Sequence, residues 1–225
     1  MSVEIVDNGI QIAVMAFCLF AAVRRAAASR SQSSMLLGCF FGLLFLAQAY
    51  WIVYIVIMGE TPTVFYVSEV SWTAAFLFMA MLTFGMLTDE ERAHRPAAGY
   101  VFMAVCAALT VFFCSYGDII TNIMMDSPLM FSGYLGIKGV SFNRGPEGDP
   151  RRKSFFLGIA LYSAFEFLLW AASCFWSDYA WTNPYYWIDF AISAIYLFIF
   201  YAFIRVEKGS AAGPAPADLT EEVPR

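Results

Sequence analysis

Four carboxylate residues interrupt the long hydrophobic segments of this sequence. They are Glu69, Asp126, Glu166 and Asp189. A carboxylate at the centre of a membrane helix costs about 3 kcal/mol on insertion scales. Each of these side chains is therefore expected to face the protein interior, to take up a proton, or to meet a cation. Binding or moving a cation is the chemistry that these residues could perform.

Glu166 is the deepest of the four carboxylates. It follows Ser154 by 12 residues, about 18 Å along a helix. Its segment carries a polar and aromatic stripe at three- and four-residue spacing, made of Tyr162, Ser163, Glu166, Trp170 and Ser173. The last hydrophobic segment carries a matching stripe, made of Tyr185, Asp189, Ser193 and Tyr196. We expect the two stripes to meet, either as a structural seam of hydrogen bonds or as a site for a ligand or a proton.

The other acids have simpler roles in this interpretation. Asp118 is expected to cap a turn, and Asp126, two residues before Pro128, to satisfy backbone groups freed by a kink. Glu69 starts its segment, where the helix dipole favours an anion, or it contributes to a ligand site. Solvated positions in loops are expected for Glu4, Asp7, Glu60 and Asp178. The candidate ligand-binding residues are Glu69, Trp72, Tyr162, Glu166, Trp170, Tyr185 and Asp189.

Composition excludes most soluble classes of protein. Of the 225 residues, 60% are hydrophobic and 14% charged, against roughly 25% charged in an average soluble domain. The single histidine, His94, lies in a charged stretch, which excludes paired-histidine haem ligation and a serine–histidine catalytic pair. The last hydrophobic segment has no lysine for a retinal Schiff base, and no phosphate-binding loop or zinc motif occurs. We therefore expect no cofactor, no metal and no nucleic-acid partner.

Hydrophobic segments predict an all-α bundle of seven membrane-spanning helices. The expected spans are about 5–23, 35–58, 66–87, 98–115, 119–137, 154–176 and 184–204, within a membrane domain of residues 1–208. With the amino terminus outside, all 13 lysines and arginines fall on the cytoplasmic side. Because basic residues near span ends set orientation, the sequence predicts an outside amino terminus and a cytoplasmic carboxyl terminus. Residues 209–225 are expected to form a disordered cytoplasmic tail.

One stretch resembles a known type of membrane module. It contains Ala47-Gln48-Ala49-Tyr50-Trp51, Tyr54, Gly59-Glu60-Thr61-Pro62 and Ser68-Glu69-Val70-Ser71-Trp72. This pattern is similar to the multi-span amino-terminal sensory module of bacterial histidine kinases and diguanylate cyclases. The characteristic positions of that module would correspond to Trp51, Tyr54, Pro62, Ser68, Glu69 and Trp72, with Glu69 where the module usually has aspartate. The resemblance implies a sensory bundle in a bacterial plasma membrane, here without an effector domain after Arg205.

Three functions remain open from the sequence. The first is a receptor that binds a small cationic or amphipathic ligand in an outer cup lined by acidic and aromatic residues. The second is a proton- or cation-coupled transporter or channel that uses Glu166 and Asp189. The third is a membrane enzyme that depends on carboxylates, and we consider an enzyme less well supported. A receptor would signal through a separate cytoplasmic protein docked on the basic loop Lys138–Lys153, beside the lipid bilayer.

Overall fold

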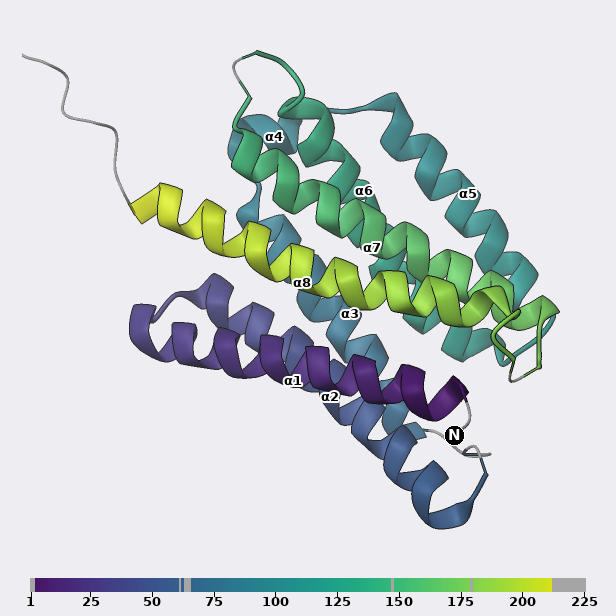
Figure 1. Cartoon of the computed structure of the whole chain (residues 1–225). Coiled ribbons are helices and arrows are strands. Elements are labelled where there is room, and N and C mark those ends of the chain that lie inside the picture. Colours follow the sequence, from purple (N-terminus) through teal and green to yellow (C-terminus); the bar gives the residue numbers. More distant parts are fainter. Residues whose placement is uncertain (1–2, 61, 63–65, 147, 179, 212–225) are drawn as a thin grey trace, which may run out of the picture.

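The residues that the structure describes fold entirely into α-helices and their connections, as the sequence predicts. The structure is a computed structural model and describes residues 3–60, 62, 66–146, 148–178 and 180–211. Its helices are α1 (Val3–Ser29), α2 (Gln32–Met58), α3 (Tyr66–Met86), α4 (Asp89–Ala93), α5 (Ala97–Phe113), α6 (Ile119–Phe142), α7 (Pro150–Phe175) and α8 (Pro184–Ala211) (Figure 1).

Local sequence explains where several of these helices begin and end. Ser31 and Asp118 cap α2 and α6 by accepting hydrogen bonds from backbone N–H groups three residues ahead, and Asp149 caps α7 just before Pro150. Gly59 ends α2 with a φ of 74°, a left-handed conformation that glycine adopts without strain. The expected cap at Asp118 and the expected turn at Gly59 are both present.

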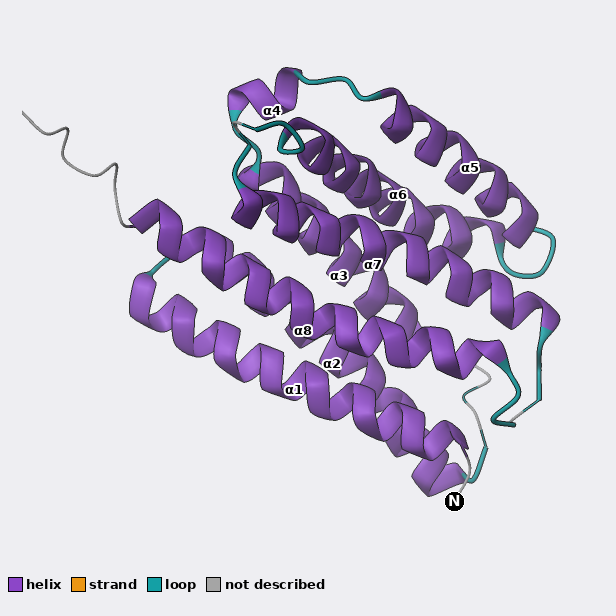
Figure 2. Cartoon of the chain, turned by 45° about the horizontal axis from the view of Figure 1, so that its top comes forward, coloured by secondary structure: helices purple, strands orange, loops and turns teal. Residues whose placement is uncertain are grey.

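Six of the long helices form a closed ring. In order around the ring they are α1, α2, α3, α6, α7 and α8, and α8 packs back against α1. The helix α5 lies outside this ring against α6 and α7, at the edge of the bundle in both views (Figures 1 and 2). The ring is tight where α6 meets α7, because a Cβ atom on Gly136 would lie 2.8 Å from the backbone nitrogen of Ala160. Only glycine allows this approach.

Aromatic side chains fill the middle of the ring. We call Phe40, Phe41, Phe76, Tyr162 and Tyr196 the aromatic floor. All five are at most 2% exposed, and they come from α2, α3, α7 and α8. Their rings contact one another, with centroids 5.7 Å apart for Phe40 and Tyr162 and 5.4 Å apart for Tyr162 and Tyr196. The floor joins four helices by edge-on and tilted ring contacts of the kind that stabilise protein cores.

Five of these helices are long and apolar enough to cross a membrane, which indicates a multi-pass membrane protein. They are α1, α2, α3, α7 and α8. The helix α5 is apolar but has only 17 residues, and α6, which carries Asp126 and Lys138, does not reach the same apolarity. Helices cover all seven expected segments, but length and composition alone mark five of them as spans.

Several boundaries differ from those expected. The helix α6 continues through Pro128 without a break. The helix α8 extends to Ala211, so the first residues of the expected tail are helical. Residues 212–225 of that tail lie outside the described part of the chain. The expected loop Lys138–Lys153 is much shorter, because α6 ends at Phe142 and α7 starts at Pro150. Lys138 is buried inside α6, with its ammonium group 5.5 Å from the centre of the Tyr134 ring.

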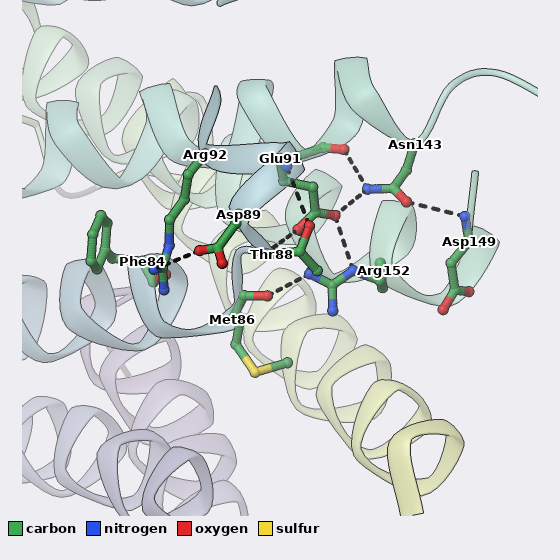
Figure 3. Close-up of polar contacts among 10 residues, drawn as sticks. Phe84, Met86, Thr88, Asp89, Glu91, Arg92, Asn143, Asp149 and Arg152 are labelled. Carbon is green, nitrogen blue, oxygen red and sulfur yellow. Dashed lines mark hydrogen bonds and ion pairs between the residues drawn. The ribbon is translucent and has the colours of Figure 1, made fainter. Parts of the chain in front are cut away.

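The charged stretch after α3 forms the short helix α4 and buries Glu91. Thr88 and Glu91 form a capping box, and the Glu91 side chain is 1% exposed. One carboxylate oxygen accepts hydrogen bonds from Asn143 Nδ2 at 2.6 Å and Arg152 Nε at 3.0 Å (Figure 3). Arg152 also forms an ion pair with the second oxygen and donates to the carbonyl of Met86. The cluster therefore ties α3 and α4 to the facing ends of α6 and α7.

A second ion pair joins three helices at the same end of the bundle. Arg25 near the end of α1 pairs with Glu207 near the end of α8. The Ser34 hydroxyl in the first turn of α2 donates to the same carboxylate at 2.9 Å. Together with the Glu91 cluster, this pair holds the helix ends that lie opposite the cavity described below.

We predict that Glu91 stabilises the fold and that the effect depends on pH. Replacing Arg152 by methionine leaves Glu91 buried without its cation, which should cost about 3 kcal/mol of unfolding free energy. Burial raises the pKa of Glu91, but the hydrogen bonds from Arg152, Thr88 and Asn143 outweigh it and hold the pKa below its ordinary value of 4.5. The stabilisation is thus complete above pH 4.5 and is lost as the pH falls through the lowered pKa.

Thermal unfolding in detergent from pH 3 to pH 8 tests this prediction. The wild type should lose stability in acid more steeply than Glu91→Gln, which has no charge to lose. Asp89→Asn is the matched control, because the side chain of Asp89 is 95% exposed and its pair with Arg92 is worth less than about 1 kcal/mol. Equal acid sensitivity in Glu91→Gln and wild type would contradict the prediction.

Candidate functional site

A cavity of about 390 Å³ opens at one end of the helix ring. It lies between the amino-terminal halves of α1, α3, α6 and α8 and the carboxyl-terminal halves of α2 and α7. Its base reaches Phe76 and Tyr196 of the aromatic floor, and its mouth includes the connection between α7 and α8. A volume of this size is in the usual range for small-molecule sites.

Three buried carboxylates converge in this cavity from three helices. Asp7 of α1, Glu166 of α7 and Asp189 of α8 are 2%, 7% and 5% exposed. Asp7 and Asp189 lie next to each other, and Gln11 donates a hydrogen bond from Nε2 to Asp189 Oδ1. Glu166 lies deeper, beside the hydroxyls of Tyr162 and Tyr196. The carboxylates are therefore held by neighbouring polar groups and not by cations.

A polar face of α1 forms one wall of the cavity. Asp7, Asn8 and Gln11 recur at three- and four-residue spacing on a helix that is otherwise apolar, so they share one face. Asn8 donates to the carbonyl of Glu4 at 2.7 Å and accepts a hydrogen bond from Gln48 of α2. One oxygen of Asp7, Oδ1, is buried and has no hydrogen-bond partner among the described residues. A buried acceptor without a partner is costly, which marks this oxygen as a place for a donor.

The cavity has an acidic and aromatic lining. Two further acids, Glu4 and Asp178, lie at its mouth, and no lysine, arginine or histidine is among the described residues that line it. The rings of Trp51 and Trp72 lie 6.0 Å apart on one wall. The aromatic residues of the lining are Trp51, Trp72, Phe76, Trp170, Trp176, Tyr185, Tyr186 and Tyr196. Carboxylates provide charge, and aromatic faces attract a cation without competing hydrogen bonds.

Other chemistries receive no support from the described residues. No group of three or more histidine, cysteine or acidic side chains there is arranged to hold a metal ion. All five cysteines are free thiols, and the only histidine, His94, packs against Phe142, next to the Glu91 cluster and away from the cavity lining. The cavity lining, with its carboxylates and aromatic rings, is suited to binding a cation.

The structure brings together most of the residues proposed from the sequence. Trp72, Glu166, Trp170, Tyr185 and Asp189 line the cavity. Tyr162 lies just beneath it as part of the aromatic floor, where it meets Tyr196. The two stripes of α7 and α8 do face each other, while Leu161, Leu168 and Phe175 on the remaining surface of α7 are exposed. Glu69 is the exception: it lies half-buried in the first turn of α3, outside the cavity lining.

Two interpretations of acidic residues were wrong. Asp7 is not a solvated loop acid, because α1 begins at Val3 and buries it in the cavity. Asp126 does not satisfy the backbone near Pro128; its Oδ2 accepts a hydrogen bond from the Thr110 hydroxyl of α5 at 2.7 Å. Asp126 is thus a link between α5 and α6, outside the cavity lining.

Sequence reasoning missed the contributions of α1 and α2 to the site. The missed residues are Glu4, Asp7, Asn8 and Gln11 on α1 and Gln48 on α2. The signal was present as a helical repeat of residues on one face of α1. This face is polar at Asp7, Asn8 and Gln11 and continues with Met15, Cys18 and Ala22, all of which are buried. Placing the start of the first helix two residues too late separated Glu4 from that repeat.

Comparisons with known proteins provide no relative for this chain. No protein-family model matches the sequence, and searches of curated proteins and of solved structures also gave no match. The site must therefore be interpreted from its own geometry.

Proposed function

We propose that this chain is a membrane receptor that binds a small organic cation in the cavity. The observation that supports this most strongly is the composition of the lining, which holds three buried carboxylates, two more acids at the mouth, many aromatic rings and no basic side chain. Such a site has buried carboxylates without a basic partner in a low-dielectric surrounding. A bound ammonium group would pair with those carboxylates, donate to Asp7 Oδ1, and contact the indole faces.

The sensory role is part of the same proposal. The stretch from Ala47 to Trp72, which resembles bacterial sensory modules, provides Gln48, Trp51 and Trp72 to the cavity wall. The chain would reside in a bacterial plasma membrane and would signal through a separate cytoplasmic protein. Because Lys138 is buried and Arg152 is paired with Glu91, the docking surface would use Arg144 and Arg151, which are exposed around the short connection between α6 and α7.

We further propose that all seven long helices cross the membrane, with the cavity facing outward. Supporting this, α5 and α6 pack side by side with the five apolar helices, and α6 belongs to the ring. Each described lysine and arginine lies in a helix half or connection at the end of the bundle away from the cavity. Basic residues on the cytoplasmic side and an acidic cavity outside fit the usual distribution of charge across a membrane.

A transporter that uses Glu166 and Asp189 is the less favoured alternative. Transport would require a path from the cavity to the opposite end of the bundle. The aromatic floor fills the ring below Glu166, with Phe40, Phe41 and Tyr162 fully buried. A closed floor beneath an open cavity favours binding over passage.

The first prediction of this proposal is that positive charge, and not apolar size, determines binding. Purified protein titrated with n-pentylamine should change its tryptophan fluorescence, because Trp51, Trp72, Trp170 and Trp176 line the cavity. The neutral analogue n-pentanol should not. Asp189→Asn should weaken amine binding about 10- to 100-fold, since hydrogen bonds to charged groups contribute about 1.5–3 kcal/mol.

Two controls sharpen this test. Glu69→Gln removes an acid near the same end of the bundle but outside the cavity lining, so its affinity should stay within about twofold of wild type. Proteoliposomes loaded with labelled amine test for flux. Equal responses to amine and alcohol would overturn the receptor proposal, and rapid amine flux would favour the transporter.

The second prediction concerns topology. In a variant without native cysteines, a cysteine at Ser177, exposed between α7 and α8, should react with a membrane-impermeant maleimide from outside intact cells. A cysteine at Arg144 should react only after the membrane is permeabilised. Tyr179, the neighbouring position that the sequence places on the outside, lies beyond the described residues. Labelling at Arg144 but not at Ser177 in intact cells would reverse the proposed orientation.

A further inference from the structure

The carboxylates of the cavity lie at three depths along the ring. The helices α7 and α8 are connected at the cavity end, so their residue numbers give depth directly. Asp189 lies five residues inside α8, about 8 Å below its start, and Glu166 lies nine residues before the end of α7, about 14 Å deep. Glu4, in the first turn of α1, lies about one helical turn, or roughly 5 Å, above Asp7.

These depths define three acidic levels. The mouth level contains Glu4 and Asp178, the middle level contains Asp7 and Asp189, and the deep level contains Glu166. Successive levels are about 5–6 Å apart, close to the rise of one helical turn. No described basic residue lines any of the three.

Apolar and aromatic residues share the cavity lining with these acids. Trp170 follows Glu166 by four residues, so it lies on the same face of α7 about one turn nearer the mouth. Trp51, Trp72 and Phe76 line the wall formed by α2 and α3. A ligand that follows the cavity downward thus meets acids at successive depths and aromatic rings on the surrounding walls.

From this spacing of acids in an aromatic-lined cavity we propose that the ligand is a linear diamine or polyamine that extends from the mouth toward Glu166. This inference rests on the proposed receptor function and names the class of cation. Spacers of three to five methylene groups place ammonium groups about 5–7.5 Å apart, which matches about one helical turn between acidic levels. One ammonium pairs with Asp7 and Asp189, the next with Glu166, and the methylene groups between them pack against the indole rings.

The unpartnered oxygen of Asp7 supports this assignment independently of the acidic cluster. Asp7 Oδ1 is buried, lacks a hydrogen-bond donor and belongs to the cavity lining. Gln11 supplies one donor to Asp189 but none to Asp7. A compact cation at the middle level would pair with Asp7 and Asp189 but would leave Glu166 without a cation, whereas a chain with two ammonium groups satisfies both levels.

Chain-matched amines provide the test. Wild-type protein in detergent is titrated with cadaverine and with n-pentylamine, which have five carbons each and differ only in the second ammonium group. Cadaverine should bind about 10- to 100-fold more tightly, because it adds charge-assisted hydrogen bonds to Glu166. Glu166→Gln should remove most of this advantage while n-pentylamine affinity stays within about threefold, since the middle level is intact.

Glu60→Gln is the matched control, because Glu60 is an exposed acid just beyond α2 and outside the cavity lining. It should keep the full advantage of cadaverine. Equal affinity for the two amines in wild type, or an unchanged advantage in Glu166→Gln, would overturn the diamine assignment and leave the receptor proposal standing. Absence of binding by either amine would instead remove the receptor proposal together with this inference.

Discussion

The cost of holding carboxylates inside a helical membrane protein is the constraint on which this structure depends. Asp7, Glu166 and Asp189 come from three different helices and cannot face lipid without a large penalty. They avoid that penalty only if α1, α7 and α8 turn the same faces toward one interior space. Closing the ring between α8 and α1 satisfies this requirement. The cavity and its acidic lining are thus a consequence of where the acids lie in the sequence.

The two ends of the ring are built in opposite ways. At the closed end, one buried and one half-buried acid are paired with arginines: Glu91 with Arg152, and Glu207 with Arg25. Breaking such a pair would leave an uncompensated charge, so these contacts hold the helix ends in place. At the cavity end, the acids have amide, hydroxyl and carboxyl neighbours, and no described basic side chain lines the cavity. The difference separates structural acids, whose cations are part of the chain, from acids that are free to meet a cation from outside.

The sequence predicted the helices far better than it predicted the lateral contacts between them. Long apolar runs locate a helix, and the stripes of α7 and α8 were visible because polar residues stand out in apolar segments. Asp7 was misjudged because a carboxylate near a terminus looks the same whether it faces water or a cavity. Glu91 shows a related limit: in a run of charged residues, nothing local reveals that Arg152, sixty-one positions later in the chain, will pair with one of them. These features are set by tertiary contacts, which residue periodicity does not encode.

The helix α6 shows why hydropathy alone undercounts the helices of such a bundle. Its two charged residues are buried: Asp126 is bonded to Thr110 of α5, and Lys138 lies against the Tyr134 ring. Gly136 lets the backbone of α6 approach the backbone of α7 closely. Close packing of this kind holds helices together where lipid provides no hydrophobic force between them, so it compensates for the low apolarity of α6. The helix α5 lies outside the ring and packs against α6 and α7. It covers α6 and contributes no described residue to the cavity lining, so the six helices of the ring form the cavity while α5 shields α6.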